Sequence, residues 1–133
     1  MRTSDSLVIG ESYSRARLGE MFGLAPIAFQ RGVFKPKDHA SVWVFVTEEA
    51  GDGVDPRGSV LRGDVLHWGG VSGGRSEALV LEHAARGLEL VLFHRRNAAQ
   101  YPDRGFRYEG AFAYDPAAAD AEAPTRFVLR RIG

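Results

Sequence analysis

Aromatic side chains beside polar loops are the feature of this sequence that could bind a ligand. Trp43 and Trp68 each lie near the end of an expected strand, next to a polar or glycine-rich loop. An indole in such a place can wall a pocket that sandwiches a planar base. Core packing is about as common a use of the ring, so both interpretations stay open. Alternating strands predict core positions for four other rings: Phe45, Phe93, Phe112 and Phe127.

Catalytic and metal-binding patterns are weak. The spacing of the histidines is not that of a metal site; they are His39, His67, His83 and His94. The segment GGVSGG at 69–74 is not followed by the lysine and serine of a phosphate-binding loop, and Ser72 lacks the strand-to-helix turn of a nucleophile. We therefore expect no catalytic residue, no metal and no cofactor. A glycosylase or nuclease using Asp64, Glu82 or His83 stays open as the weakest alternative.

Length and composition indicate one domain. The chain has 133 residues, of which 44% are hydrophobic, and its formal net charge is zero. The neutral charge counts mildly against a strong non-specific DNA binder. Without cysteine there is no disulfide or thiolate metal site. We expect a single domain over 1–133, with residues 1–10 as a loosely ordered lead-in, and a cytoplasmic location because no leader or membrane-spanning pattern is present.

Local signals predict the elements. Ser14 caps a short helix over 15–22 that Gly23 ends. The segment 78–87 fits either a helix or a strand. Gly110 suggests either a bulge in its strand or a sharply coiled strand. β-Branched, aromatic or alternating residues indicate strands over 41–49, 60–68, 88–95, 106–116 and 124–132.

These elements favour an α+β fold. We expect a small curled β-barrel of five or six strands with one or two short helices.

Five segments, taken in order, resemble one protein family. They are YSRARLGEMFG, GVFKPKDHASVWVFVTEE, DVLHWGGVSGGRSE, LEHAARGLELVLFHRR and FRYEGAFAY, within Tyr13 to Arg131. The chain is similar to the N-terminal module of bacterial McrA-like HNH restriction endonucleases, and FRYEGAFAY resembles a strand of SRA domains. Two positions depart from the family pattern, since Val71 stands where Gln is usual and Glu77 where Asp is usual. The resemblance implies a PUA/SRA-like barrel.

The resemblance also implies a function. The domain would read a modified base in double-stranded DNA, 5-methylcytosine or a related cytosine modification, by flipping it into an aromatic-walled pocket. A separate HNH nuclease domain would cut, so the module itself would not be an enzyme. A homodimer and an HNH domain in the same natural chain both stay open, and no membrane partner is expected.

Under this hypothesis, two groups of residues form the site. The base pocket would use aromatic faces and polar groups that read the base edge: Tyr13, His39, Ser41, Trp43, Asp64 and Trp68. The phosphates would be held by Lys35, Lys37, Arg75, Arg95 and Arg96. Two alternatives remain, an RNA-binding PUA-like module and an interaction or small-molecule domain that binds no nucleic acid.

Overall fold

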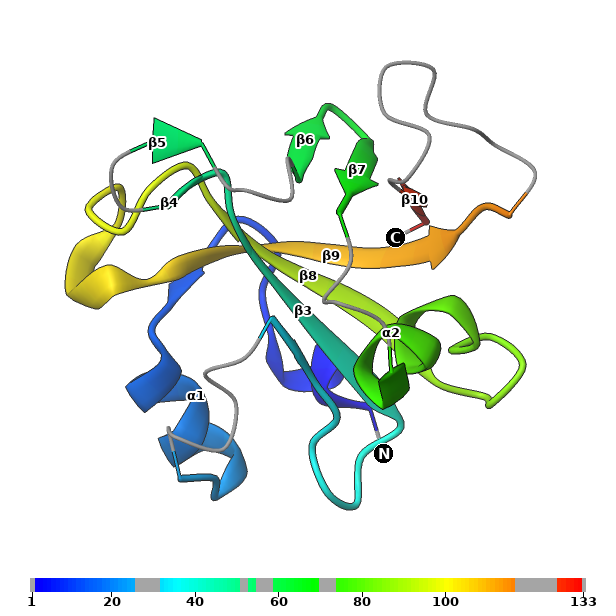
Figure 1. Ribbon diagram of the computed structural model, residues 1–133. Coiled ribbons are helices and arrows are strands. Elements are labelled where there is room, and N and C mark those ends of the chain that lie inside the picture. The colour runs from blue at the N-terminus through cyan, green and yellow to red at the C-terminus, as the bar shows by residue number, and fades with distance from the viewer. Residues whose placement is uncertain are drawn as a thin grey trace.

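The computed structural model describes residues 2–25, 32–50, 53–54, 59–69, 74–116 and 127–132. Two α-helices and two short 3-10 helices accompany the strands (Figure 1). In chain order the elements are η1 (Thr3–Ser6), β1 (Ser12–Tyr13), α1 (Arg15–Phe22), β2 (Val33–Phe34), β3 (Ser41–Thr47), β4 (Glu49–Ala50), β5 (Gly53–Val54), β6 (Val60–Arg62), β7 (Val65–Trp68), α2 (Gly74–Leu81), β8 (Glu89–Arg95), η3 (Pro102–Arg104), β9 (Phe106–Tyr114) and β10 (Phe127–Arg131).

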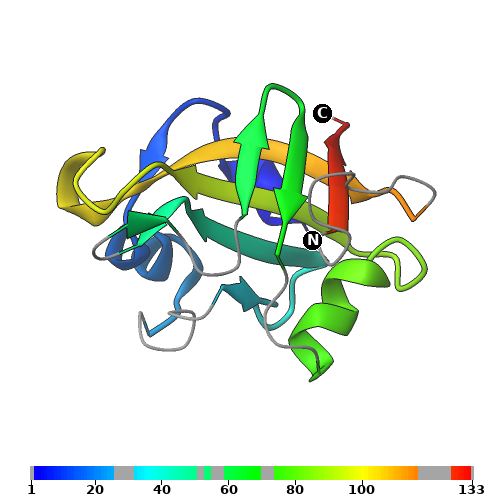
Figure 2. The same ribbon diagram turned by 45° about the horizontal axis from the view of Figure 1, so that its top comes forward.

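Eight of the strands form one mixed sheet. Its order is β2-β3-β8-β9-β10-β7-β6, with β1 also paired to β9, while β4 and β5 form a separate hairpin. The sheet curls, so that β6, β7 and β10 run across the direction of β3, β8 and β9 (Figure 2). The α+β class is confirmed. The sheet is nevertheless open and does not close into the predicted barrel of five or six strands, because within the described residues β2 pairs only with β3 and β6 only with β7.

The centre of the sheet is a parallel pair. β3 and β8 pair from Ser41 opposite Glu89 to Thr47 opposite Arg95. Six consecutive residues of β3 are buried, which is the pattern of a strand covered on both faces. Because the two strands run in the same direction, their carboxyl ends meet at one edge of the molecule.

Two apolar cores lie on opposite faces of this sheet, because successive residues of a strand point to opposite sides. Val42, Val44 and Val46 pack in one core, together with Val80 of α2. Trp43 and Phe45 pack in the other core, on the side of α1. Figure 1 shows the two helices on different sides of β3.

Local signals predict α1 correctly and mark the irregularity of the strand at Gly110. The Ser14 side chain accepts a hydrogen bond from the Arg17 N–H, and Gly23 ends α1 in the left-handed conformation. The ambiguous segment 78–87 begins inside a helix, α2, which starts earlier at Gly74. Gly110 has a φ of +92°, and the pairing of β8 with β9 shifts register between Leu92 and Phe93, opposite this part of β9.

Two predictions need correction. The segment 60–68 is a hairpin of β6 and β7 and not one strand. The chain reverses at Gly63, whose φ of +61° suits glycine. Residues 2–10, expected as a loose lead-in, are anchored at two positions, since Thr3 and Leu7 are buried although Val8 and Ile9 are exposed. The Thr3 N–H donates to Ser41 Oγ, and its Oγ1 accepts from Trp43 Nε1 at 2.9 Å.

Within the described part of the chain, no helix combines the length and the apolar character needed to cross a bilayer.

Candidate anion-binding site

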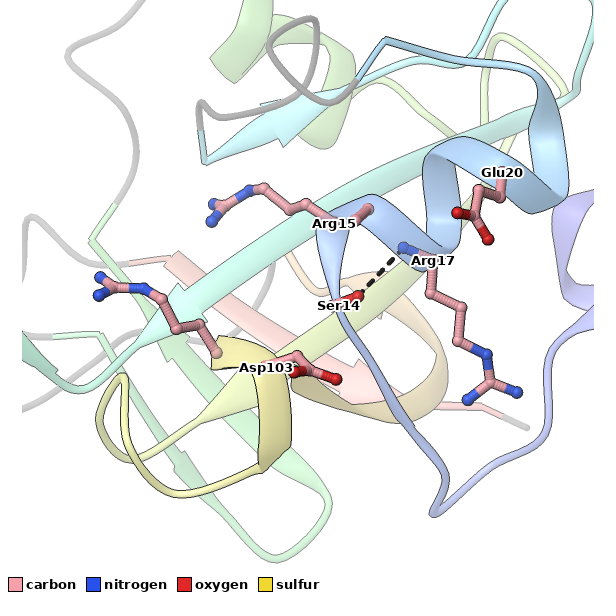
Figure 3. Close-up of a pocket in the computed structure, with 7 residues that line it drawn as sticks. Ser14, Arg15, Arg17, Glu20 and Asp103 are labelled. Carbon is pink, nitrogen blue, oxygen red and sulfur yellow. Dashed lines mark hydrogen bonds between the residues drawn. The ribbon is translucent and has the colours of Figure 1, made fainter.

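A pocket opens where the N-terminus of α1 meets the turn after β8. Its volume is about 490 Å³. It is lined by the first turns of α1 and by the tip of that turn: Ser14, Arg15, Ala16, Arg17, Glu20, Asp103 and Arg104 (Figure 3). The carboxyl ends of β3 and β8 lie beside it, because the Arg95 side chain bonds both to Thr47 at the end of β3 and to the Arg104 carbonyl of this turn.

Arg95 holds the turn from the sheet side. Its Nε donates to Thr47 Oγ1 at 2.8 Å, and its Nη1 donates to the Arg104 carbonyl at 2.6 Å. Its Cζ lies 4.0 Å from the centre of the Phe106 ring. Only 7% of the residue is exposed. Both acceptors are neutral oxygens, so within the described part of the chain no carboxylate balances this buried charge.

Arg15 reaches the same ring. Its Cζ lies 4.9 Å from the centre of Phe106 and 5.0 Å from that of Phe45. Burial, followed by the positive charge of Arg104, lowers the pKa of Arg15. Burial, followed by the charges of Arg15 and Arg104, lowers the pKa of Arg95 to about 10. We name Arg15, Arg95 and Arg104 the arginine cluster, since each of the first two feels the charge of the third.

The start of α1 adds to this positive field. The first turn carries no acidic residue, and the N-terminus of a helix has a partial positive charge. Figure 3 shows Arg15 and Arg17 leaving the helix in different directions. Arg17 lies over the ring of Tyr13 and 3.9 Å from a carboxylate oxygen of Glu11, so it belongs to a different part of the pocket.

The turn that carries Arg104 is tightly constrained. Asp103 and Arg104 have φ values of +57° and +59°, a conformation that costs roughly 1–2 kcal/mol for residues other than glycine. The next residue, Gly105, packs against β1. A Cβ there would lie 3.1 Å from the Pro102 carbonyl oxygen and 3.3 Å from backbone atoms of Tyr13. The Arg104 side chain is exposed and forms no hydrogen bond or ion pair with a described residue.

The three predicted aromatic walls do not meet. Tyr13 and Trp43 lie in the core beneath α1, whereas Trp68 lies in the core on the other face. Their exposed fractions are 2%, 0% and 2%. The Tyr13 hydroxyl accepts from the Val8 N–H. In this structure none of the three rings has a free face for a base.

The three polar residues predicted to read the base edge also do not form one site. Ser41 is buried at the start of β3, where its hydroxyl donates to Glu89 Oε2 at 2.5 Å. His39 contacts the Phe22 ring edge-on, and its Nδ1 lies 2.9 Å from the Lys37 carbonyl oxygen. Asp64 lies in the β6–β7 turn and accepts from Arg131 Nε at 2.7 Å.

The predicted phosphate contacts divide between the two ends of β3. Lys35 and Lys37 are exposed in the loop before β3, and Lys35 Nζ donates to the His39 carbonyl. Arg95 and the exposed Arg96 lie at the other end, beside the pocket. The side chain of Arg75 lies outside the described residues.

Sequence reasoning missed Arg15 and Arg104. A signal for Arg15 was available, since it directly follows a capping serine in a first turn without acidic residues. Nothing local marks Arg104, because its role depends on a turn held by the distant Arg95 side chain and by contact with β1.

A second charged cluster lies on the opposite face of β8. Glu109 is buried and accepts from Arg107 Nη1 at 2.8 and 2.9 Å, with Arg131 Nη2 at 3.3 Å. His94 Nε2 lies 2.5 Å from Glu48 Oε2. No group of three or more His, Asp or Glu residues in the described ranges could hold a metal ion. This cluster satisfies its own charges and is best explained as structural.

Comparison with protein-family models and with curated protein sequences finds no match. Among solved structures, a modification-dependent TagI restriction endonuclease is similar, with a TM-score of 0.49 and 20% sequence identity. The alignment covers 94% of this chain and 50% of that chain. This chain therefore spans about half the length of the endonuclease.

Proposed function

We propose that this chain is a DNA-recognition module that reads a modified base and holds the DNA backbone at the arginine cluster. The observation that carries the proposal is that the Cζ atoms of Arg15 and Arg95 lie 4.9 and 4.0 Å from the Phe106 ring centre, while Arg95 holds the turn that brings Arg104 to the same pocket as Arg15. The lowered pKa of Arg15 and Arg95 agrees with this grouping. The resemblance of the ordered sequence segments to the modules of HNH restriction endonucleases supports the modified-DNA part of the proposal.

Anion binding follows from the physical chemistry of the cluster. Bringing like charges together and burying one of them costs free energy, which a bound anion offsets. Guanidinium groups match the oxygens of phosphate with paired N–H donors and keep their charge at any physiological pH. A phosphate group is therefore the anion that best fits the cluster, and phosphates supply the sequence-independent part of DNA affinity.

The finer proposal concerns the base. We propose 5-methylcytosine or a related cytosine modification as the target, taken out of the duplex as the resembling modules imply. Phe45 and Phe106 are also buried in this structure, with 7% and 1% of each residue exposed, but part of their cover is the Arg15 side chain. They are therefore our candidates to stack on the base once Arg15 moves onto a phosphate. Stacking on an aromatic ring contributes roughly 1–3 kcal/mol per base, enough to offset much of the cost of extrusion. We assign strand cleavage to a separate HNH domain and none to this chain.

Binding to matched short duplexes tests the proposal. The duplexes carry cytosine, 5-methylcytosine, 5-hydroxymethylcytosine or N6-methyladenine at one position, and an RNA duplex of the same sequence serves as a fifth probe. We expect tighter binding to one cytosine-modified duplex. Equal affinity for all four DNA duplexes would reject the reader, and tighter binding of the RNA would favour an RNA-binding module.

Two variants separate the cluster from general charge effects. Arg104→Asn removes a guanidinium with a residue that tolerates a positive φ, and we expect about tenfold weaker binding to every duplex. Arg86→Asn is the control. It removes an exposed arginine that pairs with Glu82 and precedes the first residue of β8, at the other end of that strand from Arg95. This variant should leave affinity unchanged. Equal losses in both variants would mean that the cluster has no special role.

A further inference from the structure

The charges around the arginine cluster exceed what one phosphodiester neutralises. Arg95 and Arg104 each lack an ion-pair partner among the described residues, and Arg15 adds a third guanidinium group. The two acidic residues of the pocket lining, Asp103 and Glu20, form no ion pair with them within the described residues, and Figure 3 shows the Asp103 carboxylate directed away from the Arg15 guanidinium. This side of the pocket therefore carries at least two positive charges that nothing in the described structure balances.

A phosphate monoester has the matching charge. A phosphodiester carries one negative charge, whereas a monoester carries between about 1.5 and 2 at pH 7 because its second pKa is about 6. It also presents three free oxygens, so it can accept from more than one guanidinium at once. The Coulomb attraction to a positive cluster grows in proportion to this charge.

The size of the pocket fits more than a bare ion. Its volume of about 490 Å³ lies within the range typical of small-ligand sites. The rings of Phe45 and Phe106 lie beneath Arg15, with 7% and 1% of each residue exposed. A group that carries both a phosphate and a planar ring would use the charges directly and the aromatic surface once Arg15 is displaced.

We propose that the arginine cluster binds a phosphate monoester of a nucleotide, either at the 5′ end of a DNA strand or on a free nucleotide. This inference rests on the proposed function in taking nucleic acid as the ligand class, but it adds a preference for a terminal phosphate over an internal one. The two sources share one chemistry and differ only in what is attached to the sugar.

Calorimetric titrations with small probes test the chemistry. The probes are deoxycytidine 5′-monophosphate, deoxycytidine and the dinucleoside monophosphate dCpdC, which contains only a diester. We expect the monophosphate to bind at least tenfold more tightly than either of the others. Equal binding of monoester and diester, or no binding of the monophosphate and of 5′-phosphorylated DNA, overturns the inference.

The pH dependence gives a second readout. If the dianion is the bound species, its fraction falls about fourfold between pH 7.5 and pH 5.5 for a second pKa near 6, and affinity falls with it. None of the described residues that line the pocket is a histidine, so we expect the pH dependence to follow the ligand. Affinity for the monophosphate that stays constant over this interval contradicts the assignment of the dianion.

Duplexes with and without a 5′-phosphate distinguish the two sources. A tenfold gain from the 5′-phosphate supports a strand end, and binding of the free monophosphate without such a gain supports a free nucleotide. Arg104→Asn should abolish either preference, whereas Arg104→Lys should retain part of it, and Arg86→Asn should retain all of it.

The inference and the proposed function fail separately. If the protein discriminates among modified duplexes regardless of a 5′-phosphate and does not bind the monophosphate, the inference is wrong and the modified-base proposal stands. If it binds the monophosphate but does not discriminate among bases, the inference stands and the modified-base proposal is wrong.

Discussion

Arg104 combines backbone strain with charge repulsion. Its φ of +59° is unfavourable for arginine, and its charge lowers the pKa of Arg15 and Arg95. We expect Arg104→Gly to raise the free energy of unfolding by about 0.5–1 kcal/mol, because it relieves the strain and separates the charges. The same variant should bind phosphate more weakly. Urea denaturation and phosphate titration measure the two effects.

Asp103→Gly is the matched control. It relieves a similar strain at a φ of +57° and removes a carboxylate from the pocket lining. Stability should rise comparably, while phosphate affinity should be unchanged or higher. A loss of phosphate affinity in both variants would show that the shape of the turn, and not the Arg104 charge, determines binding.

Tyr108 gives the protein a dependence on alkaline pH. Burial raises the pKa of its phenol, and the charge of Glu89 and the neighbouring Tyr13 raise it further. The folded pKa therefore lies above the unfolded value near 10. Stability from this group is present below pH 10 and is lost as the pH rises above it. The depressed pKa of Arg95 acts in the opposite direction, because the folded state releases that proton first.

Tyr108→Phe isolates the tyrosine contribution. No hydrogen bond of the Tyr108 hydroxyl occurs within the described structure, so we expect stability at pH 7 within about 0.5 kcal/mol of the parent protein. At pH 11 the variant should be the more stable of the two. Thermal unfolding at both pH values measures this difference, and parallel pH profiles would contradict the sign argued above.

At the level of elements, the contact between the 102–105 turn and β1 positions Arg104. A methyl group on Gly105 would crowd the Pro102 carbonyl and the backbone of Tyr13. We expect Gly105→Ala to displace the turn and to weaken phosphate binding severalfold, although every charge remains. Isothermal titration with the monophosphate measures the effect.

Gly87→Ala is the corresponding control. Gly87 has a φ of +71° with nothing within 4 Å of an added Cβ, so the variant should lose about 1 kcal/mol of stability from strain alone. Its phosphate affinity should match that of the parent protein. If Gly105→Ala, like Gly87→Ala, lowers stability but leaves phosphate affinity unchanged, the turn does not position the ligand.

The elements also show how far sequence reasoning reaches. α1 is predictable because its cap, apolar stripe and final glycine lie within ten residues, 14–23. The β6–β7 hairpin was missed because alternation continues across Arg62-Gly63-Asp64, and only the glycine marks the reversal. The parallel pairing of β3 with β8 is a long-range event without a local signal. Arg104 could not be found from local sequence, because its turn is held by the Arg95 side chain and by contact with β1.

For the whole molecule, a formal net charge of zero limits long-range attraction to DNA. Binding through the cluster would involve about two or three phosphates. The slope of log affinity against log salt should then be about −2 to −3, a loss of roughly 10- to 60-fold between 50 and 200 mM salt. Fluorescence anisotropy over that range measures the slope. A much steeper slope would indicate that the exposed lysines and arginines elsewhere contribute as much as the cluster.

Thr3 has a practical consequence for the boundaries of the domain. It joins η1 to Ser41 and Trp43 in the middle of the sheet. A shortened version that begins after Leu7 would leave the Trp43 indole N–H and the Ser41 hydroxyl without these bonds. Limited proteolysis should accordingly leave the first ten residues attached to the folded body, and tags or fused domains are best joined ahead of Arg2.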